Sequence, residues 1–94
     1  AGPMWMYLLD RDGRVEYASR PVLGEPPERL AGRPADSLLA DPVEAARLRR
    51  FHAAVVATRR PAVHSLLLPD GRTIETHATA IVEGGEVTGI AALS

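Results

Sequence analysis

Cysteine and lysine are both absent from the 94-residue chain. Without cysteine there is no disulfide framework, no thiol nucleophile and no cysteine-ligated metal. Since every basic residue other than histidine is arginine, we interpret the usage as the mark of a GC-rich bacterial genome. No apolar run approaches the roughly 20 residues that a membrane span needs, and no signal segment is recognisable. We therefore expect a soluble, cytoplasmic protein with no membrane contact.

The chain also has little net charge and little length. A formal net charge of -1 argues against a dedicated nucleic-acid binder. A chain of 94 residues forms one domain with one modest core. We expect residues 1–94 to be that domain, excised from a longer protein, and interpret Ala1-Gly2-Pro3 before Met4 as a remnant of cloning.

The second half of the sequence predicts three consecutive antiparallel strands. Residues 62–68, 73–82 and 87–93 are rich in apolar and β-branched side chains. The turns between them contain Gly71 and the pair Gly84-Gly85, which allow the positive φ of tight hairpins. The result is a three-stranded meander.

Alternation along these strands predicts one shallow inner face. We expect the inner residues of the middle strand to be Ile74, Thr76, Ala78 and Ala80. Those of the first strand are Ala62, His64, Leu66 and Leu68, and those of the last are Val87, Gly89, Ala91 and Leu93. Because protein interiors are close-packed, so many small residues require helices, bulky side chains or a small ligand to fill the remaining space.

The first half predicts a hairpin at its start. Residues 4–9 form an apolar strand, Asp10 to Gly13 a turn, and residues 14–19 a second strand with Val15 and Tyr17 on one side. Alternation along the first strand places Met4, Met6 and Leu8 on one face, and Trp5, Tyr7 and Leu9 on the other. Both faces are apolar, so we expect a second cover on the outer side.

Helices are predicted between the hairpin and the meander. Prolines restrict residues 26–30 and 36–39 to short turns of helix. Asp41 as N-cap, Pro42 at the first turn and Glu44 three residues after the cap predict a long helix that ends near Thr58. Its predicted apolar stripe consists of Leu48, Phe51, Val55, Ala54 and Thr58.

In this order of elements the sequence resembles a PAS domain. The resemblance rests on three stretches: residues 9–17, which form the first hairpin, residues 22–33 with the pattern VLGEPPERLAGR, and residues 70–73 with 84–90 in the final hairpins. It implies an α+β fold, a five-stranded antiparallel sheet of order 2-1-5-4-3 with short helices and one long helix packed on one face. It also implies a non-catalytic sensory module of a bacterial signalling protein, such as a histidine kinase of a two-component system.

The resemblance further implies which residues face a ligand pocket and which face a partner. The expected ligand-binding residues are Trp5, Tyr7, Leu48, Phe51, Val55, His64, Leu66, Thr76, Ala78 and Ala91. The expected interface residues of a homodimer or docking module are Met4, Met6, Leu8 and Ile81. Two functions therefore stay open: a sensor that binds a small molecule and relays the change to an effector domain in the same chain, and a ligand-free dimerisation module.

The histidines carry the remaining chemistry, because imidazole is the commonest metal or haem ligand. We predict that His52 is a boundary histidine hydrogen-bonded at the surface, with haem ligation as the alternative. His64 is predicted to point into the core, where it bonds a ligand, the backbone or Tyr17. A flavin stacked on Trp5 and Tyr7 is a further alternative, but we expect no cofactor, no metal and no catalytic residue, because no triad or phosphate loop is present.

Overall fold

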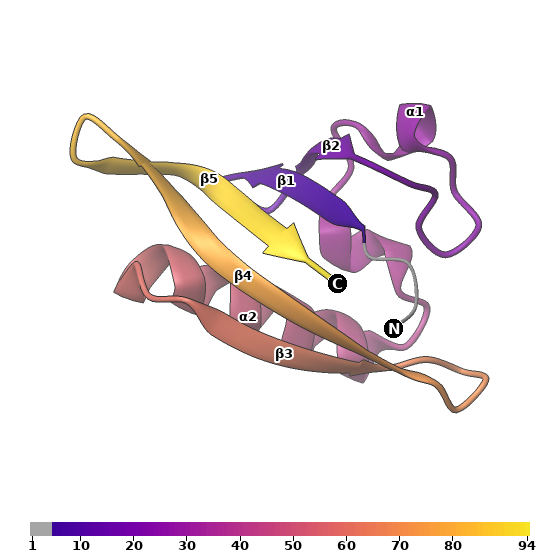
Figure 1. Cartoon of the computed structure of the whole chain (residues 1–94). Coiled ribbons are helices and arrows are strands. Elements are labelled where there is room, and N and C mark those ends of the chain that lie inside the picture. Colours follow the sequence, from indigo (N-terminus) through magenta and orange to yellow (C-terminus); the bar gives the residue numbers. More distant parts are fainter. Residues whose placement is uncertain (1–4) are drawn as a thin grey trace.

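The computed structural model describes residues 5–94, and Figure 1 shows the order of its elements. Met4, one of the expected interface residues, lies outside the described residues. The strands are β1 (Met6–Asp10), β2 (Val15–Ala18), β3 (Ala62–Leu67), β4 (Thr73–Glu83) and β5 (Glu86–Leu93). The helices are α1 (Pro27–Leu30), the 3-10 helix η1 (Ala35–Leu38) and α2 (Pro42–Thr58).

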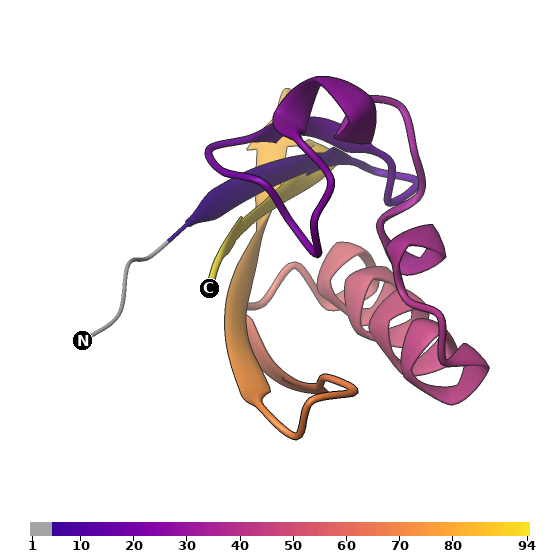
Figure 2. The ribbon, with the colours of Figure 1, turned by 90° about the vertical axis from the view of Figure 1, so that its right-hand side faces the viewer.

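The five strands form one antiparallel sheet of order β2-β1-β5-β4-β3, which confirms the predicted α+β fold. β5 lies in the middle and pairs with both β1 and β4, so the two hairpins are joined through the last strand. Figure 2 shows the sheet curling around one side, with η1 and α2 facing it from the other. The inner face of the sheet is therefore the one that the helices cover.

Helix α2 begins and ends at the residues that the sequence predicts. Asp41 Oδ1 accepts a hydrogen bond of 2.9 Å from the backbone N–H of Val43, which satisfies one of the free donors of the first turn. Arg59 ends the helix in the left-handed conformation, with φ of 58°. The buried residues are Leu48, His52 and Val55, whereas Ala54 and Thr58 are exposed, so the predicted stripe is wrong at its last two positions.

The predicted faces of the last strand are wrong after Val87, which is itself buried as predicted. Ala92 pairs with Ala78 and Ile90 with Ala80, and all four belong to or pack against the core. The register shifts between Ile81 and Val82, so that Val87 pairs with Val82 and Thr88 is the extra residue of a bulge. The bulge reverses the alternation, and Gly89, Ala91 and Leu93 therefore point to the outer face.

A second bulge changes which residues of the β1–β2 hairpin share a face. Leu8 pairs with Tyr17 and Leu9 with Val15, which leaves Glu16 as the extra residue. Val15 is consequently buried, whereas Tyr17 is 48% exposed on the outer face. The prediction that Val15 and Tyr17 share a side is wrong for this reason.

Gly89 lets the two halves of the sheet approach each other. It pairs with Asp10 of β1 and with Ile81 of β4. A Cβ at this position would overlap the carbonyl oxygen of Leu9. Glycine is therefore required for the close backbone contact between β5 and β1.

Candidate functional site

A cavity of about 340 Å³ lies between the inner face of the sheet, α2 and the irregular segment that carries α1 and η1. Strands β1 to β4 contribute residues of their inner faces, and α2 contributes Leu48. The irregular segment contributes Val22, Leu30, Ala35, Leu38 and Leu39 among others. Ala18 and Ala35 are the two alanines on its walls, and leucine is the commonest residue there, whereas Ala78 and Ala92 lie in the packed core.

Most of the residues predicted to bind a ligand meet around this cavity. Its walls include Trp5, Tyr7, Leu48, His64, Leu66 and Thr76. Val55 and Ala78 are instead buried in the hydrophobic core, and Phe51 packs against that core. Ala91 pairs with the exposed Thr79 and lies on the opposite face of the sheet, so the predicted direction of its side chain is wrong.

The polar groups of the cavity gather around the end of β5. Thr76 Oγ1 and Ser94 Oγ share a hydrogen bond of 2.9 Å. Burial raises the pKa of Tyr7 to about 12, although the side chain of Thr76 opposes this rise. Tyr7 is therefore a neutral phenol at physiological pH.

Two cavity-lining side chains carry buried polar atoms with no hydrogen-bond partner among residues 5–94. They are the indole Nε1 of Trp5 and the Nε2 of His64. The alternative that Tyr17 satisfies His64 is wrong, because Tyr17 lies on the outer face. A buried donor without a partner costs about 1 to 3 kcal/mol. These atoms are therefore the strongest indication that the cavity takes a polar group.

Helix α2 places a second imidazole beside the first. His52 is 5% exposed, and its Nε2 likewise has no partner in the described part of the chain. The prediction of a surface histidine is wrong, because His52 lies one turn after Leu48 on the same buried face. The ring of Phe51 lies 5.5 Å from that of His52 and 5.0 Å from that of His64, measured between centroids.

Both imidazoles are neutral at physiological pH. Burial lowers the pKa of His52 to about 4; the nearby His64 lowers it further and Asp36 opposes the change. Burial also lowers the pKa of His64; the guanidinium of Arg47 lowers it further and Glu44 opposes the change. The chemistry available at the site is therefore hydrogen bonding between neutral groups, because two neutral imidazoles and a neutral phenol offer no charge.

The sequence profile of the PAS fold family matches residues 1–94. The chain belongs to the PAS fold family. This confirms the resemblance on which the sequence analysis relied. The comparison with curated proteins gives no significant match.

Solved structures agree with this assignment of the PAS domain. The PAS domain of BvgS from Bordetella pertussis superposes with a TM-score of 0.71 at 22% identity, covering 94% of this chain and 72% of that one. VqmA from Vibrio cholerae superposes with a TM-score of 0.76 at 20% identity. The match covers 97% of this chain and 44% of that one, so the chain spans less than half of VqmA. The PAS domain of the quorum-sensing receptor RpfR from Cronobacter turicensis superposes with a TM-score of 0.66 at 16% identity, covering 100% of this chain and 94% of that one. At these identities the likeness shows the shared fold.

Several cavity residues between β2 and α2 were not predicted from the sequence. Val22 and Leu39 lie outside the regular elements and Leu38 ends the short helix η1, so no periodicity marks them as residues of the cavity of the PAS domain. Ser94 also lines it, directly after β5. Once the bulge is known, alternation along β5 places Ser94 on the inner face with Ile90 and Ala92. The bulge itself has no clear signal in the sequence.

Leu23 joins this cavity to a second, more open hollow. That hollow also involves Leu38, Leu39 and Leu68, which line the cavity as well. Leu23 and Gly24 have φ of 51° and 83°, within a turn closed by hydrogen bonds between Val22 and Glu25. Leucine is unusual at positive φ, where asparagine or glycine is favoured. The turn thus holds a half-exposed apolar side chain between the two hollows.

Two further properties concern only residues 5–94. None of the helices found there is both long enough and apolar enough to cross a membrane. Within the same range, no group of three or more histidine or acidic side chains is arranged to hold a metal ion. Asp10 stabilises the turn between β1 and β2, because its Oδ1 accepts hydrogen bonds from the backbone N–H groups of Asp12 and Arg14.

The buried His52 makes stability depend on pH. In the unfolded chain a histidine has a pKa of about 6.5, so below this pH the unfolded state binds a proton that the folded state binds only near pH 4. The free energy of unfolding therefore falls as the pH drops from about 6.5 toward 4, and we expect His52 to contribute a loss of about 2 to 3 kcal/mol between pH 7 and 4.5. Urea unfolding at both pH values measures it.

The matched variants are His52→Leu, which removes the buried imidazole, and His77→Gln, which removes an exposed one bonded to Glu75. The first is expected to lose less stability on acidification than the natural protein, and the second to lose as much. An equal loss in His52→Leu and the natural protein would contradict the assignment.

Proposed function

We propose that this PAS domain is a non-catalytic sensory domain that binds a small molecule in its cavity and passes the change to an effector domain in the same chain. The effector of a bacterial histidine kinase is one such domain. The single observation that carries the proposal is the pair of unpartnered polar atoms, Trp5 Nε1 and His64 Nε2, on the wall of an apolar cavity in the described structure. Pockets of this composition, mainly apolar with a few converging polar groups, are typical ligand sites.

The last strand supplies a route from the cavity to the rest of the protein. Ser94 bonds Thr76 through its side chain at 2.9 Å, and its backbone exchanges two hydrogen bonds with Trp5, of 2.9 and 3.2 Å. A ligand that bonds Trp5, Thr76 or His64 therefore acts on groups attached to the end of β5. The ligand shifts the equilibrium between two positions of β5 only by the difference in its affinity for them.

Relatives of the same fold support a small-molecule ligand. The RpfR domain was solved in complex with BDSF and also with C12:0. VqmA was solved bound to DPO. We propose that this domain likewise binds a small molecule and holds no haem or flavin tightly. The purified protein is therefore expected to be colourless.

The cavity is tested by a pair of neighbouring substitutions in β3. Leu66 lines the cavity, whereas Leu67 is 56% exposed on the other side of the strand. We expect native mass spectrometry of protein purified from its own host to find a small molecule bound to the natural domain. Leu66→Trp fills the cavity and is expected to lose that molecule, while the control Leu67→Trp retains it.

Three results would decide against the cavity as the site. They are a natural domain of bare polypeptide mass, a bound molecule that survives Leu66→Trp, or one that disappears equally in Leu67→Trp. Circular dichroism of both variants checks that each is folded.

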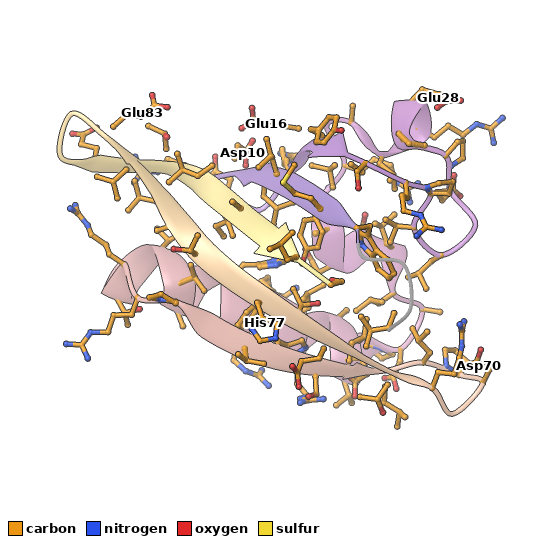
Figure 3. The ribbon with its side chains drawn as sticks, viewed as in Figure 1. Asp10, Glu16, Glu28, Asp70, His77 and Glu83 are labelled. Atoms are coloured by element: carbon orange, nitrogen blue, oxygen red, sulfur yellow. The ribbon has the colours of Figure 1, made fainter. Side chains whose placement is uncertain are left out.

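A second function, homodimerisation, is favoured by the outer face of the sheet. A row of paired residues crosses four strands there: Met6, Leu93, His77 and Val63. Met6 is 38% exposed, Leu93 45% and Val63 55%. Leu8 and Ile81, also expected at the interface, are half-buried on this face. Figure 3 looks onto it, with His77 on β4 and with acidic side chains around the edges of the molecule, among them Asp10, Glu16, Glu28, Asp70 and Glu83.

Exposed apolar side chains gathered on one face are typical of interaction sites, and here they flank the polar His77. VqmA is described as a dimer. We propose that a second copy of the domain covers the row. Sedimentation velocity across a concentration series is expected to show reversible dimerisation. Leu93→Glu is expected to weaken it about tenfold or more, because it buries a charge in the contact.

The matched control is Val43→Glu, which places the same charge on an exposed apolar position of α2, away from the sheet. It is expected to leave dimerisation unchanged. A domain that stays monomeric at every concentration, or two variants that dimerise equally well, would contradict the outer face as the interface.

A further inference from the structure

The walls of the cavity contain polar groups but almost no charge. The polar side chains on the walls are Trp5, Tyr7, His64, Thr76 and Ser94, all of which are neutral at physiological pH. No carboxylate is found on the walls in the described part of the chain. The other wall residues are aliphatic, apart from Gly24 and Arg72. The site is therefore electrically neutral along most of its surface.

The one cationic wall residue is engaged elsewhere. Arg72 lies in the β3–β4 turn, where its Nε donates to Asp70 Oδ2 at 2.7 Å, and its side chain is 75% exposed. The two hydrogen bonds of Arg72 to Asp70 hold the pKa of that carboxyl below its usual value. A buried ionic ligand needs a paired charge, because desolvation of an unpaired ion costs far more than one hydrogen bond returns. The cavity offers no such partner in its interior.

The unpartnered atoms specify what the ligand must present. An indole N–H only donates, so the group that meets Trp5 has to be a hydrogen-bond acceptor. A neutral imidazole nitrogen either donates or accepts, according to its tautomer. An amide or a hydroxyl satisfies either atom, because each of these groups accepts and donates. Ser94 and Thr76 lie between Trp5 and His64 across the sheet, so each atom needs a group of its own. A hydrocarbon satisfies neither.

We propose that the cavity selects an uncharged, mainly apolar small molecule with separate amide or hydroxyl groups, one that accepts a hydrogen bond from Trp5 Nε1 and one that bonds His64 Nε2. This inference rests on the proposed sensory function and specifies the chemistry of its ligand. A volume of about 340 Å³ lies at the small end of the range of about 300 to 1,000 Å³ for small-molecule sites.

The test uses four probes of one skeleton: benzamide, benzyl alcohol, benzoate and toluene. Trp5 is the only tryptophan, so its indole N–H gives a single, self-assigned signal in a ¹H–¹⁵N spectrum. Benzamide and benzyl alcohol are expected to shift that signal in titrations of the natural domain. Toluene is expected to bind without the downfield shift of a new hydrogen bond, and benzoate to bind at least tenfold more weakly than benzamide, since it is charged.

Trp5→Phe removes the donor and keeps an aromatic ring in its place. The variant is expected to bind benzamide about five- to tenfold more weakly, because one hydrogen bond is lost, and to bind toluene with unchanged affinity. An equal loss for both probes indicates disruption of the cavity and overturns the proposed bond. If Trp5→Phe does not fold, the titrations of the natural domain still test the proposed ligand class.

The outcomes separate the two proposals. Benzoate binding as tightly as benzamide, or benzamide binding with the indole signal unmoved, overturns the ligand class and leaves a sensory cavity in place. If none of the four probes binds and the natural domain also carries no molecule from its host, the sensory function itself fails.

Discussion

The central position of β5 is the constraint on which the rest of the structure depends. This strand pairs with β1 on one side and β4 on the other, so its register decides which residues of both hairpins face the helices. The bulge at Thr88 turns Ile90 and Ala92 inward. Gly89 keeps the backbones of β5 and β1 close, since any larger residue would meet the carbonyl oxygen of Leu9. The inner face of the sheet, α2 and the irregular segment then enclose the cavity between them.

Much of the fold was predictable from the sequence, for identifiable physical reasons. Helix α2 carries its own cap at Asp41 and its own first-turn proline, so its limits depend on local interactions. Alternation is correct in β1 and over the inner residues of β4, where no extra residue interrupts the ladder. It fails in β2 and β5, because a bulge is stabilised by tertiary pairing and changes the phase without an evident local signal.

The candidate site was predictable only in part, because it combines regular and irregular backbone. Residues on strands and on α2, such as Tyr7, His64 and Leu48, follow from periodicity together with the family resemblance. Val22 and Leu38 come from segments whose path is set by packing. The burial of His52 was also missed, since its own side chain favours a surface position and only its spacing from Leu48 places it inside. His52 therefore lies buried on α2, whereas the imidazole on the wall of the cavity is that of His64.

The central claim is that the inner face of the sheet leaves an open, largely apolar space in the folded domain. A crystal structure of the purified domain under xenon pressure tests it most directly, because xenon occupies apolar cavities without needing a specific group. We predict xenon between Leu30, Leu48 and Leu66, with the sheet order and both bulges as described. A structure in which Trp5 and Tyr7 fill this space and no xenon enters would contradict the claim.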